Sequence, residues 1–289
     1  VEIMQTDPDA FDNTYILGQL WRLTPRIVDL GMLEEAEMLY RLVEQIPFAS
    51  EDPFDNWGYQ TFLVDYYQQQ AGDEDEVITR RGATAAAMSN EQIQDGALWV
   101  AKLLAGDLWQ AGFHARAVEI WEGLCHSEIA HKFAERQIEP TMNLAQAYIE
   151  LGRADEAVPL LIDAVGHLEE EVAIGIRHPE TLRRLAEVYA LLGRDEDALD
   201  MLEMAVDYGN WESHIGARNW LRFSKLPFDH LHEDPRYLVQ NDRMIAIRDH
   251  QAANIRGLLA RHDIETLLEP VVELWTKKVA DLEPAMGTD

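Results

Sequence analysis

The stretch LAQAYIELGRADEA (residues 144–157) recurs further along the chain as LAEVYALLGRDEDA (residues 185–198). Both copies carry a glycine at the same point, and glycines stand at the equivalent point of three earlier segments. The five evenly spaced glycines are Gly31, Gly72, Gly112, Gly152 and Gly193. A fixed period of this kind is typical of a repeat protein, in which each unit buries its apolar face only against its neighbours.

The residues around each glycine predict two helices joined by a tight turn, in which glycine takes a positive φ. Apolar residues recur eight positions before the glycine, at Leu23, Val64, Leu104, Leu144 and Leu185. Small or β-branched residues recur five positions after it, at Ala36, Val77, Ala117, Ala157 and Ala198. One helix before the glycine and one after it would produce these offsets. Each unit is therefore expected to be a helix A, a turn and a helix B.

The two copies at residues 144–157 and 185–198 resemble the tetratricopeptide repeat through their Leu-Ala-x-x-Tyr, Gly and Ala positions. The resemblance covers units three to five, whereas Gln68 in unit two and Pro25 in unit one depart from the pattern. The period is also longer than is usual for this repeat, which leaves open whether the helices or the loops between units are longer. The resemblance implies an all-α, right-handed superhelical solenoid of about five helix pairs. We expect a polar lead-in at 1–14, repeats at 15–225 and a C-terminal helical cap at 226–289.

A second resemblance follows the last repeat. AVDYGNW (residues 205–211) and LPFDHLHEDPRY (residues 226–237) are similar to the end of the repeat regions that are fused to bacterial membrane-spanning winged-helix regulators and class III adenylate cyclases. It implies a regulatory or sensory role in a bacterial signalling protein. It also implies an extracytoplasmic, periplasmic location in the first kind of protein and a cytoplasmic one in the second.

The chain is strongly acidic, with 53 Asp and Glu against 24 Lys and Arg and a formal net charge of −29. Part of this charge has a local cause, since acidic residues follow several repeat glycines, where the positive end of the helix B dipole attracts them. The remaining excess fits a basic partner or a halotolerant source. Nucleic-acid binding is excluded for this region because phosphate recognition needs clustered Lys and Arg. No stretch is apolar enough for a membrane span.

Catalytic motifs are absent from the sequence, which lacks the phosphate-binding, zinc-protease, CxxC and GxSxG patterns. We therefore expect a non-enzymatic protein without a cofactor. The alternative is a metal-dependent or enzymatic protein that uses His230, His232 and Asp234, which share one predicted loop. The single cysteine, Cys125, is expected to be a small buried residue on helix B of unit three.

The exposed positions of helix A are the candidate binding site, because in tetratricopeptide arrays they line a concave groove. Projected onto this chain they are Tyr59, Phe62, Tyr66, Trp99, Lys102, Trp109, Met142, Gln146, Ile149, Arg183 and Glu187. Aromatic side chains concentrate binding energy at interfaces, but aromatics at helical spacing also fill cores, so both interpretations stay open. The expected partner is a protein or peptide, favoured if basic. A homo-oligomer and a structural subunit of a larger complex are further alternatives.

Overall fold

Four of the predicted repeat turns are formed as expected. In a computed structural model, which describes residues 27, 30–37, 74–90, 98–126, 134–210, 223–224 and 226–261, positive φ angles occur at Gly31 (74°), Gly112 (86°), Gly152 (74°) and Gly193 (70°). After the third of these, the Arg153 N–H donates to the Tyr148 carbonyl at 2.7 Å. Such a bond satisfies a carbonyl left open at the helix end. The remaining turn glycine, Gly72, lies outside the described residues.

The regular elements of the described residues are all helices, and none of them is a strand, so the expected all-α class is confirmed. Three consecutive pairs of helices A and B are α8 (Leu98–Gln110) with α9 (His114–Cys125), α11 (Ala134–Glu150) with α12 (Ala154–Ala173), and α13 (Pro179–Leu191) with α14 (Asp195–Asp207). A further helix, α6 (Glu74–Ala87), occupies the helix B position of unit two. No helix in this described part combines the length and apolar character needed to cross a bilayer.

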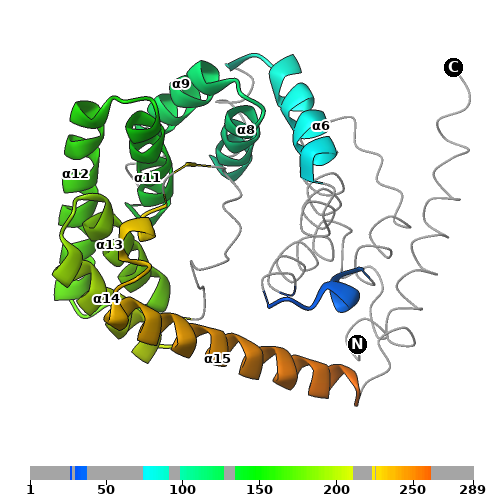
Figure 1. Cartoon of the computed structure of the whole chain (residues 1–289). Coiled ribbons are helices and arrows are strands. Elements are labelled where there is room, and N and C mark those ends of the chain that lie inside the picture. Colours follow the sequence, from blue (N-terminus) through cyan, green and yellow to red (C-terminus); the bar gives the residue numbers. More distant parts are fainter. Residues whose placement is uncertain are drawn as a thin grey trace, which may run out of the picture. The chain divides into compact units, whose positions relative to one another are not determined.

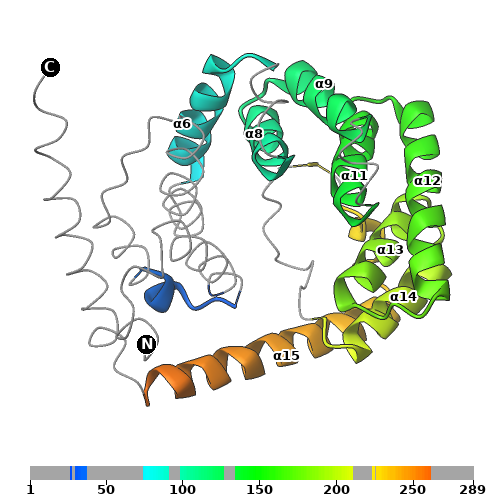
Figure 2. The same cartoon turned by 180° about the vertical axis from the view of Figure 1, so that it is seen from behind.

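The chain divides into two compact units, residues 1–77 with 249–289 and residues 78–248. The second unit holds the three complete pairs, and each of its helices from α8 to α14 packs on the next. In Figures 1 and 2, α8 and α11 line the inner side of this curved row, and α9 and α12 lie on its outer side. The predicted domain boundaries remain predictions.

Small residues allow the paired helices to approach closely. Fully buried alanines, each at 0% exposure, stand at Ala105, Ala145 and Ala186 of the A helices and at the predicted positions Ala117, Ala157 and Ala198 of the B helices. Larger apolar residues then fill the space between pairs, as protein interiors require. Gly82 on α6 belongs to the same kind of contact, because a Cβ added there would lie 2.1 Å from the Cβ of Ala111.

Helix B differs in length between two units. It has 12 residues in unit three, where it is α9, and 20 residues in unit four, where it is α12. In unit four, residues 174–178 lead from α12 to α13. The longer period of unit four therefore includes a longer helix.

Carboxylates open the B helices of units four and five as predicted: Asp155 and Glu156 in α12, and Asp195, Glu196 and Asp197 in α14. The arginine that follows the turn glycine pairs with one of them in each unit. Arg153 contacts Glu156 at 2.6 Å, and Arg194 contacts Asp197 at 2.8 Å. Part of the acidic excess is thus compensated within the repeat itself.

The Asp-Pro-Arg-Tyr element begins helix α15 (Pro235–Leu259), which lies within the region predicted as a helical cap. Asp234 accepts the backbone N–H of Arg236 at 2.7 Å, which caps the helix, and Pro235 fits its first turn. Tyr237 is fully buried beside Phe228, with ring centroids 5.5 Å apart. Arg236 also reaches the acidic face of α14, so this element joins α15 to the last repeat.

Candidate functional site

The predicted groove residues of the first units lie largely outside the described structure. Tyr59, Phe62 and Tyr66 belong to residues that the structure does not describe, and of Trp99 only its place in α8 is described. Their role in binding therefore stays a prediction.

The charged residues predicted for the groove are held in ion pairs of the A helices. Lys102 of α8 contacts Glu139 of α11 at 2.6 Å, and Arg184 of α13 lies 3.8 Å from the same carboxylate. Arg183 forms an ion pair with Glu187 one turn along α13. These contacts tie three successive A helices together, a structural task that the groove prediction did not anticipate.

Several predicted groove residues are buried or half-buried, whereas a free binding surface is exposed. Trp109, Met142 and Glu187 are 3%, 6% and 6% exposed, whereas Gln146 and Ile149 are half-buried. Residues of the same chain cover this region, since the ring centroid of Phe223 lies 5.2 Å from that of Trp109. At these positions the packing interpretation has direct support, and the binding interpretation stays a prediction.

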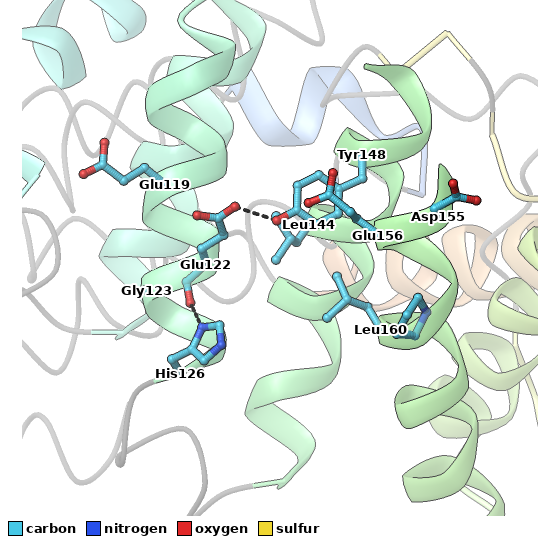
Figure 3. A pocket seen from close by; sticks show the side chains of 10 residues that line it. Glu119, Glu122, Gly123, His126, Leu144, Tyr148, Asp155, Glu156 and Leu160 are labelled. Carbon is cyan, nitrogen blue, oxygen red and sulfur yellow. Dashed lines mark hydrogen bonds between the residues drawn. The ribbon is translucent and has the colours of Figure 1, made fainter. Parts of the chain in front are cut away.

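A cleft of about 640 Å³ opens on the outer side of the repeats, between α9 and α12, as Figure 3 shows. Its walls are Glu119, Glu122, Gly123 and His126 of α9, Leu144 and Tyr148 of α11, and Asp155, Glu156, Pro159 and Leu160 of α12. Leu144 and Tyr148 are buried and form an apolar floor. Carboxylates from both outer helices surround this floor, so the cleft is apolar inside and acidic at its rim.

Polar contacts fix the geometry of the cleft. The hydroxyl of Tyr148 donates to Glu122 at 2.5 Å, and the Nδ1–H of His126 donates to the carbonyl of Glu122 at 2.6 Å. The guanidinium of Arg153 lies over the Tyr148 ring, 4.1 Å from its centroid, while it pairs with Glu156. Burial, together with the neighbouring carboxylate, raises the pKa of Tyr148 to about 12. The tyrosine is therefore a neutral hydrogen-bond donor at physiological pH.

The charge of the cleft is only partly compensated. Four carboxylates line it, and the Arg153 guanidinium, which holds the pKa of Glu156 below its ordinary value, offsets one of them. Among the residues that the structure describes, no ion pair engages Glu119 or Asp155. A cationic group would find both apolar contact and hydrogen-bond acceptors here.

The same arrangement partly recurs one repeat later. The hydroxyl of Tyr189 donates to Glu169 at 2.5 Å, and the guanidinium of Arg194 lies 4.1 Å from the Tyr189 ring centroid. The tyrosine and the arginine thus also connect successive repeats. The sequence did contain a sign of this contact, because the tyrosine and the Gly-Arg pair recur at the same positions of both copies. Their spacing alone did not reveal that the arginine stacks on the tyrosine.

The predicted metal loop does not gather its three residues around one point. His230 pairs with Asp195 of α14 at 2.8 Å, and the closest approach of His232 to a carboxylate is 3.8 Å, to Asp229. Asp234 caps α15 instead. Across the described ranges, no group of three or more His, Cys, Asp or Glu is placed to hold a metal ion. The metal-dependent alternative gains no support from this geometry.

Cys125 is partly buried at the end of α9, with its sulfur 3.6 Å from the Thr141 hydroxyl. Burial raises the pKa of its thiol. Since the thiolate is the reactive form, this side chain is suited to packing, although it is half-buried and not fully buried as expected.

The family comparison agrees with the helical pairs. Residues 137–208 match the family model for the tetratricopeptide repeat. No curated protein matches the chain. Among solved structures, the chain is similar to BtubC (BKLC) from P. vanneervenii, with 15% sequence identity, a TM-score of 0.34, and coverage of 85% of this chain and 93% of that one. The likeness of residues 226–237 to bacterial regulators stays a prediction. The family match and the observed helix pairs together identify residues 137–208 as tetratricopeptide repeats.

Proposed function

We propose that this chain is a protein-interaction module that holds a basic segment of a partner protein in the cleft between α9 and α12. Tetratricopeptide repeats generally mediate interactions between proteins. The observation that carries the proposal is the cleft itself, which combines a volume of about 640 Å³, an apolar floor and a rim of four carboxylates.

The chemistry of the cleft favours an arginine or lysine side chain. Such side chains bury their aliphatic stems against apolar surface and keep their charged heads at the edge. Leu144 and Pro159 offer the apolar contact, and Glu119 and Asp155 lie at the rim. Arginine is the better fit of the two, because its planar guanidinium donates two hydrogen bonds to a carboxylate at once.

Exposed apolar residues next to the cleft extend the proposed contact. Val158 and Ile162 stand one turn apart on α12 and are 44% and 59% exposed. They flank Pro159, which is itself a wall of the cleft. A partner segment with an apolar residue close to its basic one would cover this strip. The net charge of −29 would also speed its approach at low ionic strength.

A regulatory role follows if the resemblance of residues 226–237 is correct. Occupancy of the cleft or self-association of the module would then be relayed to a fused output domain. The structural-subunit alternative instead predicts that the purified chain self-associates, which its mass in solution measures directly.

A displayed library of short random peptides tests the proposal. We expect selection on the native chain to enrich peptides that carry Arg or Lys next to an apolar residue. Enriched peptides should lose binding to the Glu119→Gln/Asp155→Asn variant. They should keep it with Glu170→Gln/Asp242→Asn, a control that removes two exposed acids away from the cleft.

The control separates the cleft from the general charge of the molecule, because both variants lose the same charge. Equal weakening by both variants would mean that only the overall field attracts the peptides. Enriched peptides without basic residues would also reject the proposal.

A further inference from the structure

We propose a second binding site on the inner face, where α8 and α11 end, for an extended peptide with an aromatic residue followed by Ser or Thr. We propose also that Phe223 and Ser224 of this chain occupy that site as a built-in competitor. The site is separate from the cleft described above and does not depend on it.

Phe223 makes an apolar contact with the repeats, and Ser224 makes a polar one. The Phe223 ring is 5% exposed and lies 5.2 Å from Trp109 and 6.5 Å from Trp121, measured between ring centroids. The next residue, Ser224, is exposed but donates both its backbone N–H (3.1 Å) and its hydroxyl (2.8 Å) to one oxygen of Glu150. A buried aromatic anchor beside a polar clamp on the backbone is a common pattern in peptide recognition.

The receiving residues Trp109, Trp121 and Glu150 all belong to the repeats. Trp109 and Trp121 belong to α8 and α9, their ring centroids are 5.8 Å apart, and Trp109 also stacks on His114 at 4.3 Å. Glu150 is the last residue of α11. Phe223 and Ser224, by contrast, lie outside any helix, and Ser224 is 74 residues from Glu150 along the chain. The repeat pattern therefore provides the surface, and a segment from beyond the repeats fills it.

The chain after Ser224 has its own anchors. Phe228 and Leu231 are buried at 0% and 5% exposure, and Asp229 accepts the Leu226 N–H at 2.6 Å. His230 pairs with Asp195 of α14. Because these contacts do not involve Trp109 or Glu150, Phe223 and Ser224 can leave their site while α15 stays joined to the last repeat.

The chemistry of the partner follows from the contacts of the occupant. The first residue must be aromatic to pack against the two tryptophans. The second must donate twice to Glu150, which requires a backbone N–H and a hydroxyl, so Ser or Thr fits and Pro does not. A segment held in the same chain acts at an effective concentration of the order of millimolar. A tethered segment with an intrinsic Kd of about 0.1 mM would therefore weaken any peptide that competes for the site roughly tenfold.

The probe for the test is a fluorescent peptide based on residues 221–228, with Gln in place of Arg222 and Lys225 (LQFSQLPF) so that the acidic cleft does not bind it, measured by anisotropy. We expect the Phe223→Ala/Ser224→Ala protein to bind it about tenfold more tightly than the native protein does. A peptide with Ala in place of its first Phe, the equivalent of Phe223, should not bind. Adding Glu150→Ala, which removes the acceptor, to the double variant should remove the advantage of Ser over Ala in the peptide. The cleft variant Glu119→Gln/Asp155→Asn should bind the probe as the native chain does.

Hydrogen exchange of the native protein gives a second measurement that needs no substitution. Excess free peptide should increase exchange at residues 223–224 and leave α11 and α13 unchanged. The proposal is overturned if a folded double variant binds the probe no better than the native chain. It is overturned as well if the double variant loses its helical circular dichroism signal, because Phe223 would then be part of the core. The proposal is also overturned if excess peptide leaves the hydrogen exchange at residues 223–224 of the native protein unchanged.

Discussion

Removing Asp107 should destabilise the protein more than any change at an exposed ion pair. Asp107 of α8 lies 2.6 Å from the guanidinium of Arg81 on α6, and the two side chains are only 1% and 2% exposed. The Asp107→Ala variant leaves the guanidinium buried without this carboxylate. Breaking a buried ion pair from one side costs about 3–5 kcal/mol, because the remaining charge keeps its desolvation penalty.

Two further variants identify the cause of that loss. The paired change Arg81→Met/Asp107→Leu removes both charges and keeps the volume, so its stability should stay near that of the native chain or rise by about 1–4 kcal/mol. Arg243→Ala breaks the pair with Asp207, in which both side chains are more than a third exposed, and should cost at most about 1 kcal/mol.

Urea unfolding followed by far-ultraviolet circular dichroism measures these differences. Because repeat arrays can unfold in more than one step, hydrogen exchange of α6 and α8 should accompany it. The reasoning is refuted if Asp107→Ala costs less than about 1 kcal/mol, or if the paired change is as damaging as the single one.

Three other changes have defined outcomes. Gly152→Ala places a side chain at φ 74° and should lower the stability by about 1–2 kcal/mol. Gly166→Ala, within helix α12, should instead raise the stability by about 0.5–1 kcal/mol. If thermal unfolding shows that both variants change the stability in the same direction, the argument about the turn is contradicted. The pKa of Tyr148 is raised to about 12, so the stability that its neutral hydroxyl contributes is present below pH about 10 and is lost as pH rises through about 12. The difference in phenolate absorbance between native and Tyr148→Phe protein should have its midpoint near pH 12, and a midpoint near pH 10 would count against the hydrogen bond. Asp234→Ala removes the cap of α15 and should lower stability by about 0.5–2 kcal/mol in urea unfolding, while Asp234→Asn should retain most of the cap.

Local rules of the sequence determined the repeat. Glycine is required where the backbone turns with positive φ, and alanine is required where two helices cross, so Gly152, Ala145 and Ala157 indicated the helix pair before any contact was known. The carboxylates that open α12 and α14 were equally predictable, because the helix dipole acts within the first turn. Units three to five could be identified from these positions alone.

Contacts between residues far apart in the chain were decided only by the tertiary structure. Trp109 was a candidate for binding a partner, and the fold places Phe223 against it. The arginines after the turn glycines had no predicted role, and the fold stacks Arg153 on Tyr148 beside the cleft. Helical periodicity specifies which face of a helix is buried, but it does not specify which distant segment covers that face. The covering segment depends on how successive helix pairs are oriented and on where the chain returns after the last repeat. The sequence therefore determined the repeat, and the tertiary structure determined which surfaces of the repeat remain open.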